Sequence, residues 1–361
     1  MTYFKITKIV FFLSILLQLK SHGQLLEENS NQKDLNNFVQ ISEKVLPILG
    51  MPVNLFQIFQ EERENKILKN IVDVCARVDY VYKKLVWGES PCLSLPWKYD
   101  YVSELGKPLL YWEYSSGNVA DDFEKKNTTV ILGGVHADEV TPIHMAFKVA
   151  KTLHDNPETY RDVRVIIAPL VNPDGFFAHP FKRTNANGVD LNRNFPTRTW
   201  DSYATKEWLN ARVKDKRKFP GYYANSEQGT RFQTDLIEKF RPDRIISIHA
   251  PLAFLDLDFD YKRLFNKNSK LSEEQKKAKE VARIISRNAG NYRIIDLGSY
   301  PGSLGNYAGN ERTIPTITLE LSSSDSKKVY KFWDDFSPGI FKALKYEFRP
   351  NQVADLKSFI Q

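Results

Sequence analysis

The chain has 361 residues, of which 42% are hydrophobic and 26% are charged, and this composition excludes a disordered or fibrous protein. Its length is enough for a large buried core and for two or three domains. The formal net charge of +7 is modest, and it indicates a solvated surface of mixed charge with no nucleic-acid partner.

The first residues have the pattern of a secretory signal peptide. A basic start, MTYFKITK, precedes the apolar run IVFFLSILLQL, and the small residues Ser21 and Gly23 follow. The apolar run has 11 residues, whereas a membrane-spanning helix needs about 20. We therefore expect residues 1–23 to be a signal peptide cleaved near Gly23, and the mature chain to be periplasmic or secreted. No later segment predicts a stable membrane span.

Residues 24–98 are predicted to form a helical N-terminal region. A first segment, 36–49, ends where Gly50 and Pro52 stop a helix. In a second segment, 67–87, apolar residues lie three or four apart and form one stripe: Ile67, Ile71, Val74, Val78, Val81 and Leu85. The region is either an inhibitory prosegment or a structural cover for the main domain, and the sequence allows both.

The two cysteines of the chain, Cys75 and Cys92, lie in this region. In an oxidising compartment they can form a disulfide that closes a short loop and stabilises the fold by about 3 kcal/mol. Cys75 also lies on the apolar stripe, where a buried free thiol fits equally well. The sequence leaves both states open.

From residue 99 to residue 345 the chain alternates apolar strands with helix-like stretches and is predicted to form the main domain. The predicted strands are 128–134, 163–170, 244–250 and 313–321. This alternation predicts an α/β sheet with helices on both faces, and such sheets bind ligands at the carboxyl ends of their strands. Residues 346–361 are predicted to be a C-terminal tail.

The segment GGVHADEV, residues 133–140, follows a predicted strand and carries a candidate metal site. Thr141 and Pro142 are typical of a helix N-cap and a first helical position, so His136 and Glu139 are expected in the turn between strand and helix. Imidazole and carboxylate groups are ligands of zinc, and a catalytic zinc ion takes three protein ligands and leaves a fourth position for water. This pair alone is a weak signal, since a histidine near a glutamate is usually a hydrogen-bonded pair.

His249 is the candidate third ligand. It ends the predicted strand RIISIHA, so its imidazole should emerge at the same sheet edge as His136. A single histidine at a strand end is more often structural, but its placement beside the first pair favours a metal site. The remaining histidines are not assigned to the metal: His22, His144, His154 and His179.

The segment RTNANGVDLNRNF, residues 183–195, is either a polar loop or part of a substrate site. Asn192 and Arg193 offer a donor pair and a guanidinium that suit a bidentate grip on a carboxylate. Arg183 is a candidate for stabilising a developing oxyanion. Asp190 is placed to accept the second ring N–H of a ligand histidine and so to orient that ring.

Glu320 ends an otherwise apolar strand. In TITLEL, Thr316, Thr318 and Glu320 share one face of the strand. A carboxylate in such surroundings is costly unless it is paired or functional, and we interpret Glu320 as a general base for a zinc-bound water. The alternative is an exposed glutamate at a strand end.

Six motifs in this order resemble the zinc metallocarboxypeptidases of the carboxypeptidase A family, over roughly residues 99–340. They are GGVHADE, VNPDG, RTNANGVDLNRNF, SIHAP, GSLGNYAG and TLEL. The resemblance implies a mixed, largely parallel sheet and one zinc ion held by His136, Glu139 and His249. It also implies Arg183 as oxyanion stabiliser, Asn192 and Arg193 as carboxylate clamp, Glu320 as base, and Tyr300 as a mobile tyrosine that closes over the substrate.

Within that family, GVDLNRNFP followed by GSLGNYAG is similar to the murein peptide amidases. This similarity implies a peptidase whose substrate is a peptide or muropeptide, cut at the γ-D-glutamyl to diaminopimelate bond, and the export expected from residues 1–23 fits it. The acidic run LDLDFD, with Asp256, Asp258 and Asp260, can receive the second ammonium of a diamino acid, or it can be a solvated or calcium-binding loop.

Two other functions are compatible with these residues. An acylamino-acid deacylase of the same fold would share the His-x-x-Glu pair and an Asp-Leu-Asn-Arg signature. A non-catalytic binding protein would keep the fold without hydrolysis.

Overall fold

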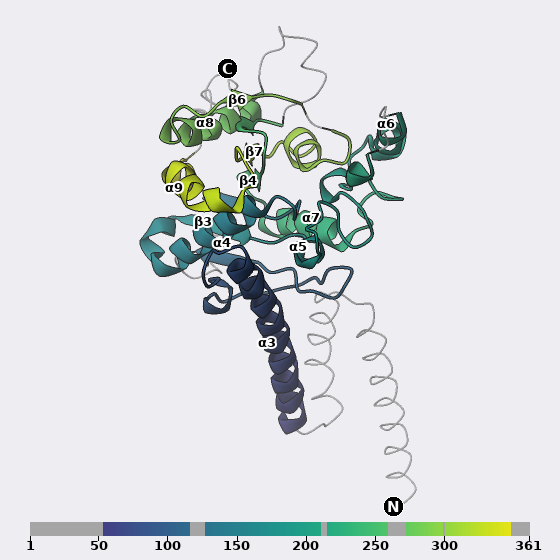
Figure 1. The fold of residues 1–361 in the computed structure, drawn as a ribbon, viewed down its shortest axis with the longest axis vertical. Coiled ribbons are helices and arrows are strands. Elements are labelled where there is room, and N and C mark those ends of the chain that lie inside the picture. The colour runs from purple at the N-terminus through teal and green to yellow at the C-terminus, as the bar shows by residue number, and fades with distance from the viewer. Residues whose placement is uncertain (1–52, 116–126, 211–214, 259–271, 299, 348–361) are drawn as a thin grey trace, which may run out of the picture.

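The computed structural model describes residues 53–115, 127–210, 215–258, 272–298 and 300–347, with described side chains beginning at Glu62 (Figure 1). The expected signal peptide, residues 1–23, and the predicted helical segment 36–49 therefore lie outside the described residues. So does nearly all of the predicted tail.

A seven-stranded mixed sheet forms the centre of the molecule, with strand order β1-β3-β2-β4-β7-β5-β6. Neighbouring strands are parallel except at two places, where β1 pairs antiparallel with β3 and β5 with β7. The strands are β1 (Trp112–Ser115), β2 (Asn127–Leu132), β3 (Val163–Ala168), β4 (Arg244–His249), β5 (Phe254–Asp256), β6 (Ile294–Ile295) and β7 (Thr316–Glu320). The four predicted strands are β2, β3, β4 and β7, and their ends differ from the prediction by at most three residues.

Helices cover both faces of this sheet (Figure 1). The α-helices are α3 (Val53–Lys84), α4 (Val140–Asp155), α5 (Pro173–Phe177), α6 (Thr205–Asn210), α7 (Gln228–Phe240), α8 (Glu273–Asn288) and α9 (Val329–Lys345). Short 3-10 or π turns are η1 (Cys92–Ser94), η2 (Pro157–Tyr160), η3 (Leu191–Arg193), η4 (Trp200–Ala204), η5 (Lys216–Lys218), η7 (Gly305–Asn310) and η8 (Ser326–Lys328). Within the described ranges, no helix combines the length and the apolar character needed to cross a membrane.

Alternate residues of the central strands point into two separate cores. Ile131, Ile246 and Ile317 are fully buried in one core, together with side chains of α4, α8 and α9. Val130 and Ile245 are buried in the other core, with side chains of α7. Because successive side chains of a strand point to opposite faces, a strand covered on both sides is apolar throughout. The predicted α/β class, a mixed and largely parallel sheet with helices on both faces, is confirmed.

The predicted N-terminal stripe packs into the first of these cores. Val74, Val78 and Val81 of α3 are at most 6% exposed. Cys75 and Cys92 form a disulfide that ties α3 to the following loop. Trp87 then donates a hydrogen bond of 2.8 Å from its indole to the carbonyl of Ser326. The described part of this region is thus joined to the sheet domain, while the rest of α3 extends away from it (Figure 1).

The strand register brings the predicted functional residues to one edge of the sheet. His249 pairs directly with Glu320 at the carboxyl ends of β4 and β7. After the neighbouring strand β2 ends at Leu132, the chain turns through Gly134, which has a φ of +61°. A Cβ atom there would lie 2.9 Å from Ile143, so only glycine fits this close approach.

The start of α4 differs from the sequence prediction. Thr141 was expected to be the N-cap, but Glu139 occupies that position and the helix begins at Val140. The Thr141 hydroxyl instead donates a hydrogen bond of 2.8 Å to the carbonyl of Ser323. A tertiary contact therefore takes the side chain that local sequence assigned to the cap.

We expect a truncated chain that begins at residue 97 to lose folded, soluble protein and to gain no activity. The truncation would expose the apolar surface that α3 and Trp87 bury. Size-exclusion chromatography and an assay of the hydrolytic activity expected from the sequence measure the two outcomes. In the full chain, Val78→Ser should lower the unfolding midpoint, whereas Leu68→Ser on the exposed side of α3 should leave it unchanged. A soluble truncated chain with raised activity would instead identify an inhibitory prosegment.

Candidate metal centre

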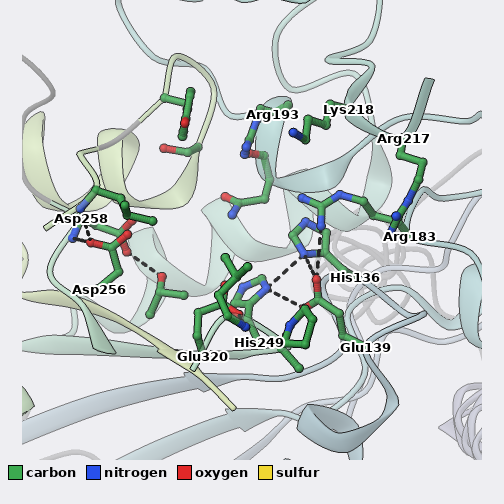
Figure 2. A pocket seen from close by; sticks show the side chains of 18 of the residues that line it. His136, Glu139, Arg183, Arg193, Arg217, Lys218, His249, Asp256, Asp258 and Glu320 are labelled. Atoms are coloured by element: carbon green, nitrogen blue, oxygen red, sulfur yellow. Dashed lines mark hydrogen bonds and ion pairs between the residues drawn. The ribbon is translucent and has the colours of Figure 1, made fainter. Parts of the chain in front are cut away.

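Three predicted residues from distant parts of the chain meet at the carboxyl edge of the sheet: His136, Glu139 and His249, called here the His–Glu–His cluster (Figure 2). His136 Nδ1 lies 3.0 Å from Glu139 Oε1 and 3.1 Å from His249 Nδ1. His249 Nδ1 lies 3.1 Å from Glu139 Oε2. All three side chains are buried.

Secondary structure fixes each member of the cluster. His136 and Glu139 lie in the tight turn between β2 and α4, where the backbone N–H of Glu139 donates to the carbonyl of His136 at 3.2 Å. His249 is the last residue of β4. The next backbone N–H, that of Ala250, donates to Glu139 Oε2 at 3.1 Å and holds the carboxylate against the strand end.

Polar partners behind the cluster orient both imidazole rings. Asp190 Oδ1 lies 3.0 Å from Nε2 of His136, as the sequence suggested. Ser247 Oγ lies 2.9 Å from Nε2 of His249. Each ring thus has its outer nitrogen engaged and its Nδ1 turned toward the Glu139 carboxylate.

The donor atoms of the cluster fit a zinc ion. Two imidazole nitrogens and a carboxylate oxygen are a ligand set found in catalytic zinc sites. One atom from each of the three residues can be chosen so that all lie within 4.8 Å of one another. The cluster also borders an open cavity, which leaves space for a water or substrate ligand.

Arg183 lies beside the cluster and is held by two carboxylates. Its Nε lies 3.0 Å from Asp190 Oδ2, and its Nη1 lies 3.2 Å from Glu139 Oε1. Burial alone would raise the pKa of Asp190, but Arg183 and His136 outweigh burial and hold that pKa well below its usual value. Asp190 therefore stays ionised, and Arg183 keeps its position next to the cluster.

Glu320 faces the same cavity from the end of β7 and is 8% exposed. The backbone N–H of Leu252 donates to its Oε2 at 3.3 Å. Burial, with the nearby Glu139 charge, raises the pKa of Glu320 above its usual value. A carboxylate with a raised pKa beside a metal site has the basicity that proton transfer from water requires.

Asn192, Arg193 and Tyr300 also line the cavity. Asn192 Oδ1 accepts a hydrogen bond of 2.8 Å from the backbone N–H of Leu304, which leaves the amide NH₂ to donate elsewhere. The guanidinium of Arg193 lies 4.7 Å from the ring centroid of Tyr300, a half-exposed side chain. The structure therefore brings all three predicted substrate-binding residues to one wall.

The GSLG turn fixes the position of this wall. Gly302 has a φ of +77°, and a Cβ atom there would lie 2.0 Å from the carbonyl oxygen of Arg193. Its own carbonyl accepts a hydrogen bond of 2.9 Å from the N–H of Phe195. A glycine is required here because no side chain fits between the two backbones.

The cavity has a volume of about 480 Å³ and an acidic end. Asp256 and Asp258 line that end, and Glu320 and His249 lie between them and the pair His136 and Glu139 (Figure 2). Burial raises the pKa of Asp256 to about 6, and burial together with Asp256 raises the pKa of Asp258 well above its usual value. Thr318 donates to Asp258 Oδ2 at 2.6 Å. Asp260, the third predicted acidic residue, lies outside the described residues.

Sequence reasoning missed three residues of this site. Ser247 lies two residues before His249 on the same strand face, a spacing that could have indicated a partner for the ring. Arg217 and Lys218 line the cavity from turn η5, but the sequence DKRKF reads only as a solvated charge run.

Comparisons with known proteins agree with this geometry. A profile of the zinc carboxypeptidase family matches residues 102–344. Murein peptide amidase A of Vibrio campbellii is 31% identical over 223 residues, which cover 61% of this chain and 76% of the relative. Murein peptide amidase A of Escherichia coli K12 is 29% identical over 235 residues, 64% of this chain and 84% of the relative.

Among solved structures, carboxypeptidase A from Helicoverpa armigera shares the fold. The two superimpose with a TM-score of 0.54 at 18% identity, over 69% of this chain and 68% of the other. The family match spans the sheet, the His–Glu–His cluster and the cavity walls. It therefore supports the hydrolytic activity of the family in this chain. The chain belongs to the zinc carboxypeptidase family and is a hydrolase of the peptidase type.

Proposed function

We propose that this peptidase is an exported murein peptide amidase that hydrolyses the γ-D-glutamyl to diaminopimelate bond of cell-wall peptides. One observation carries the proposal: a single cavity is lined by the His–Glu–His cluster, by Asn192 and Arg193, and by an acidic end. The similarity to murein peptide amidases supports it. Export is supported by the predicted signal peptide and by the disulfide, because disulfides persist in oxidising compartments.

In this proposal His136, Glu139 and His249 hold one zinc ion. Zinc, when bound in such a site, polarises a carbonyl and makes water more acidic. Glu320 accepts the proton of the attacking water and passes it to the leaving amine. Arg183 donates to the carbonyl oxygen as negative charge develops there, and Asp190 keeps the guanidinium in place.

The rest of the cavity selects the leaving residue. Asn192 and Arg193 grip its carboxylate, because an amide NH₂ and a guanidinium are matched donors for two carboxylate oxygens. Tyr300 covers the bound residue from the Arg193 side. Asp256 and Asp258 accept the side-chain ammonium of a diamino acid, which would restore the charge that burial now disfavours.

Replacing the proposed base should abolish turnover without removing zinc. Glu320→Gln keeps the side-chain volume but cannot accept the proton, so kcat should fall by about 10²- to 10⁴-fold. Initial rates and zinc content by elemental analysis measure the two effects. The exposed Glu347→Gln is the matched control and should retain full activity. Comparable turnover in Glu320→Gln would exclude Glu320 as the base.

Zinc content should depend on the three residues of the His–Glu–His cluster. We expect about one zinc ion per chain in the native protein and far less in His249→Ala, because catalytic sites need all three protein ligands. His154→Ala, an exposed histidine of α4, should keep its zinc. A chelator should remove activity and added zinc should restore it. Equal zinc content in both variants would rule out this ligand set.

Muropeptides should yield a diaminopimelate-containing product and a new D-glutamyl terminus. Asp256→Asn/Asp258→Asn should lower kcat/KM for a peptide ending in a diamino acid. The same variant should leave unchanged the kcat/KM for a matched peptide whose side-chain amine is absent, since only the ammonium needs these carboxylates. Mass spectrometry identifies the products. Hydrolysis of acylated amino acids without any muropeptide cleavage would instead identify the deacylase alternative.

A further inference from the structure

Turn η5 places two cations on the cavity wall opposite the acidic end. Arg217 and Lys218 line the cavity together with Asp215, which caps the turn by accepting from the N–H of Arg217 at 3.0 Å. Figure 2 shows Arg183 and Arg217 on one side of the His–Glu–His cluster, and Asp256 and Asp258 on the other. The cavity thus has basic side chains toward one end and acidic side chains at the other.

Arg217 is fixed at this wall by the turn that carries the cluster. Its Nη2 forms an ion pair of 2.5 Å with Asp138 Oδ2, and Asp138 lies between His136 and Glu139 in the sequence. This contact attaches η5 directly to the site. The Arg217 side chain is 64% exposed and lines the cavity, so the N–H groups that do not pair with Asp138 are free to donate to a ligand there.

Lys218 has the longer ion pair of the two cations. Among the residues that the structure describes, the carboxylate that pairs with its ammonium is Asp215, at a distance of 3.9 Å. That distance is too long for a hydrogen bond. An ammonium that lines a substrate cavity with such a loose partner is available to an anionic group of the substrate.

The proposed direction of the substrate places its acyl-side residue at this wall. With the leaving residue held by Arg193 and by the acidic end, the scissile carbonyl lies at the cluster. The residue that supplies the carbonyl must then extend past Arg183 toward η5 (Figure 2). A γ-linked glutamyl residue keeps its α-carboxylate free, whereas an α-linked residue has no free carboxylate on its main chain.

We propose that Arg217 and Lys218 form a second carboxylate-binding subsite, which recognises the free α-carboxylate of a γ-linked acidic residue on the acyl side of the scissile bond. The inference rests on the proposed function and adds a substrate class to it. Lys218 supplies the direct charge contact, and Arg217, held by Asp138, supplies further N–H donors. The subsite explains how a carboxypeptidase-type cavity distinguishes γ-linked from ordinary peptide bonds.

The test uses two peptides that differ by one group. One is L-Ala-γ-D-Glu-diaminopimelate, and the other carries a carboxamide in place of the glutamyl α-carboxylate. The native enzyme should have a kcat/KM about tenfold higher for the carboxylate peptide, since a charge-assisted hydrogen bond is lost with the amide. Lys218→Met should lower only the kcat/KM for the carboxylate peptide and bring the ratio close to one. Lys218→Glu should reverse the preference.

Lys216→Met is the matched control. Lys216 belongs to the same turn, but it is not among the described residues that line the cavity of the His–Glu–His cluster. In this variant the ratio of kcat/KM for the carboxylate peptide to kcat/KM for the carboxamide peptide should equal that of the native enzyme. Cleavage of both peptides by the native enzyme at equal rates would overturn the subsite and leave the proposed function standing. An equal loss for both peptides in Lys218→Met would also overturn the subsite. Cleavage of neither peptide by the native enzyme would overturn both proposals.

Discussion

The buried Asp190 carboxylate is the contact on which the rest of the site depends. One oxygen lies against the outer nitrogen of His136 and accepts from the backbone N–H of Asn192 at 2.9 Å, and the other pairs with Arg183. This one side chain therefore aligns a ring of the His–Glu–His cluster, the guanidinium of Arg183 and the backbone at Asn192. A carboxylate with no exposed surface is stable only because all these donors converge on it.

The acidic and the basic side chains of the cavity come from different segments of the chain. The acidic end comes from β5 and the residues after it, at the side of the sheet where β5 pairs with β7. The basic wall comes from the long connection between β3 and α7, which carries Arg183, Arg193 and turn η5. Because the two ends derive from different segments, their charges can differ without disturbing the sheet between them. A cavity of this kind orients a substrate that bears both ammonium and carboxylate groups.

Residues on regular elements were the most predictable from sequence. His249 and Glu320 follow from strand periodicity and from the rule that parallel strands present their carboxyl ends at one edge. The N-cap of α4 was predicted wrongly because Thr141 makes a tertiary contact that local sequence does not encode. Arg217 and Lys218 were missed for a related reason. Their approach to the cavity depends on the Asp138 ion pair and on the path of a loop, and neither leaves a periodic signal.

The disulfide state shows where sequence reasoning reaches its limit. Cys75 fits an apolar stripe whether it is a free thiol or bridged, so composition and spacing gave equal support to both states. The deciding quantity is the distance between the two Cα atoms, which is 5.2 Å and depends on how the loop after α3 folds back. The path of the loop after α3 therefore decides the disulfide state, and the helical pattern carries no information about that path.

The close approach of Gly302 to Arg193 has a consequence for how the enzyme can adapt to its substrate. The two backbones touch with no intervening side chain, so the loop that carries Arg193 has no room to shift toward the glycine turn. Adjustment to peptides of different shape must therefore come from rotation about side-chain bonds. Tyr300 is half exposed, which leaves its side chain room for such rotation.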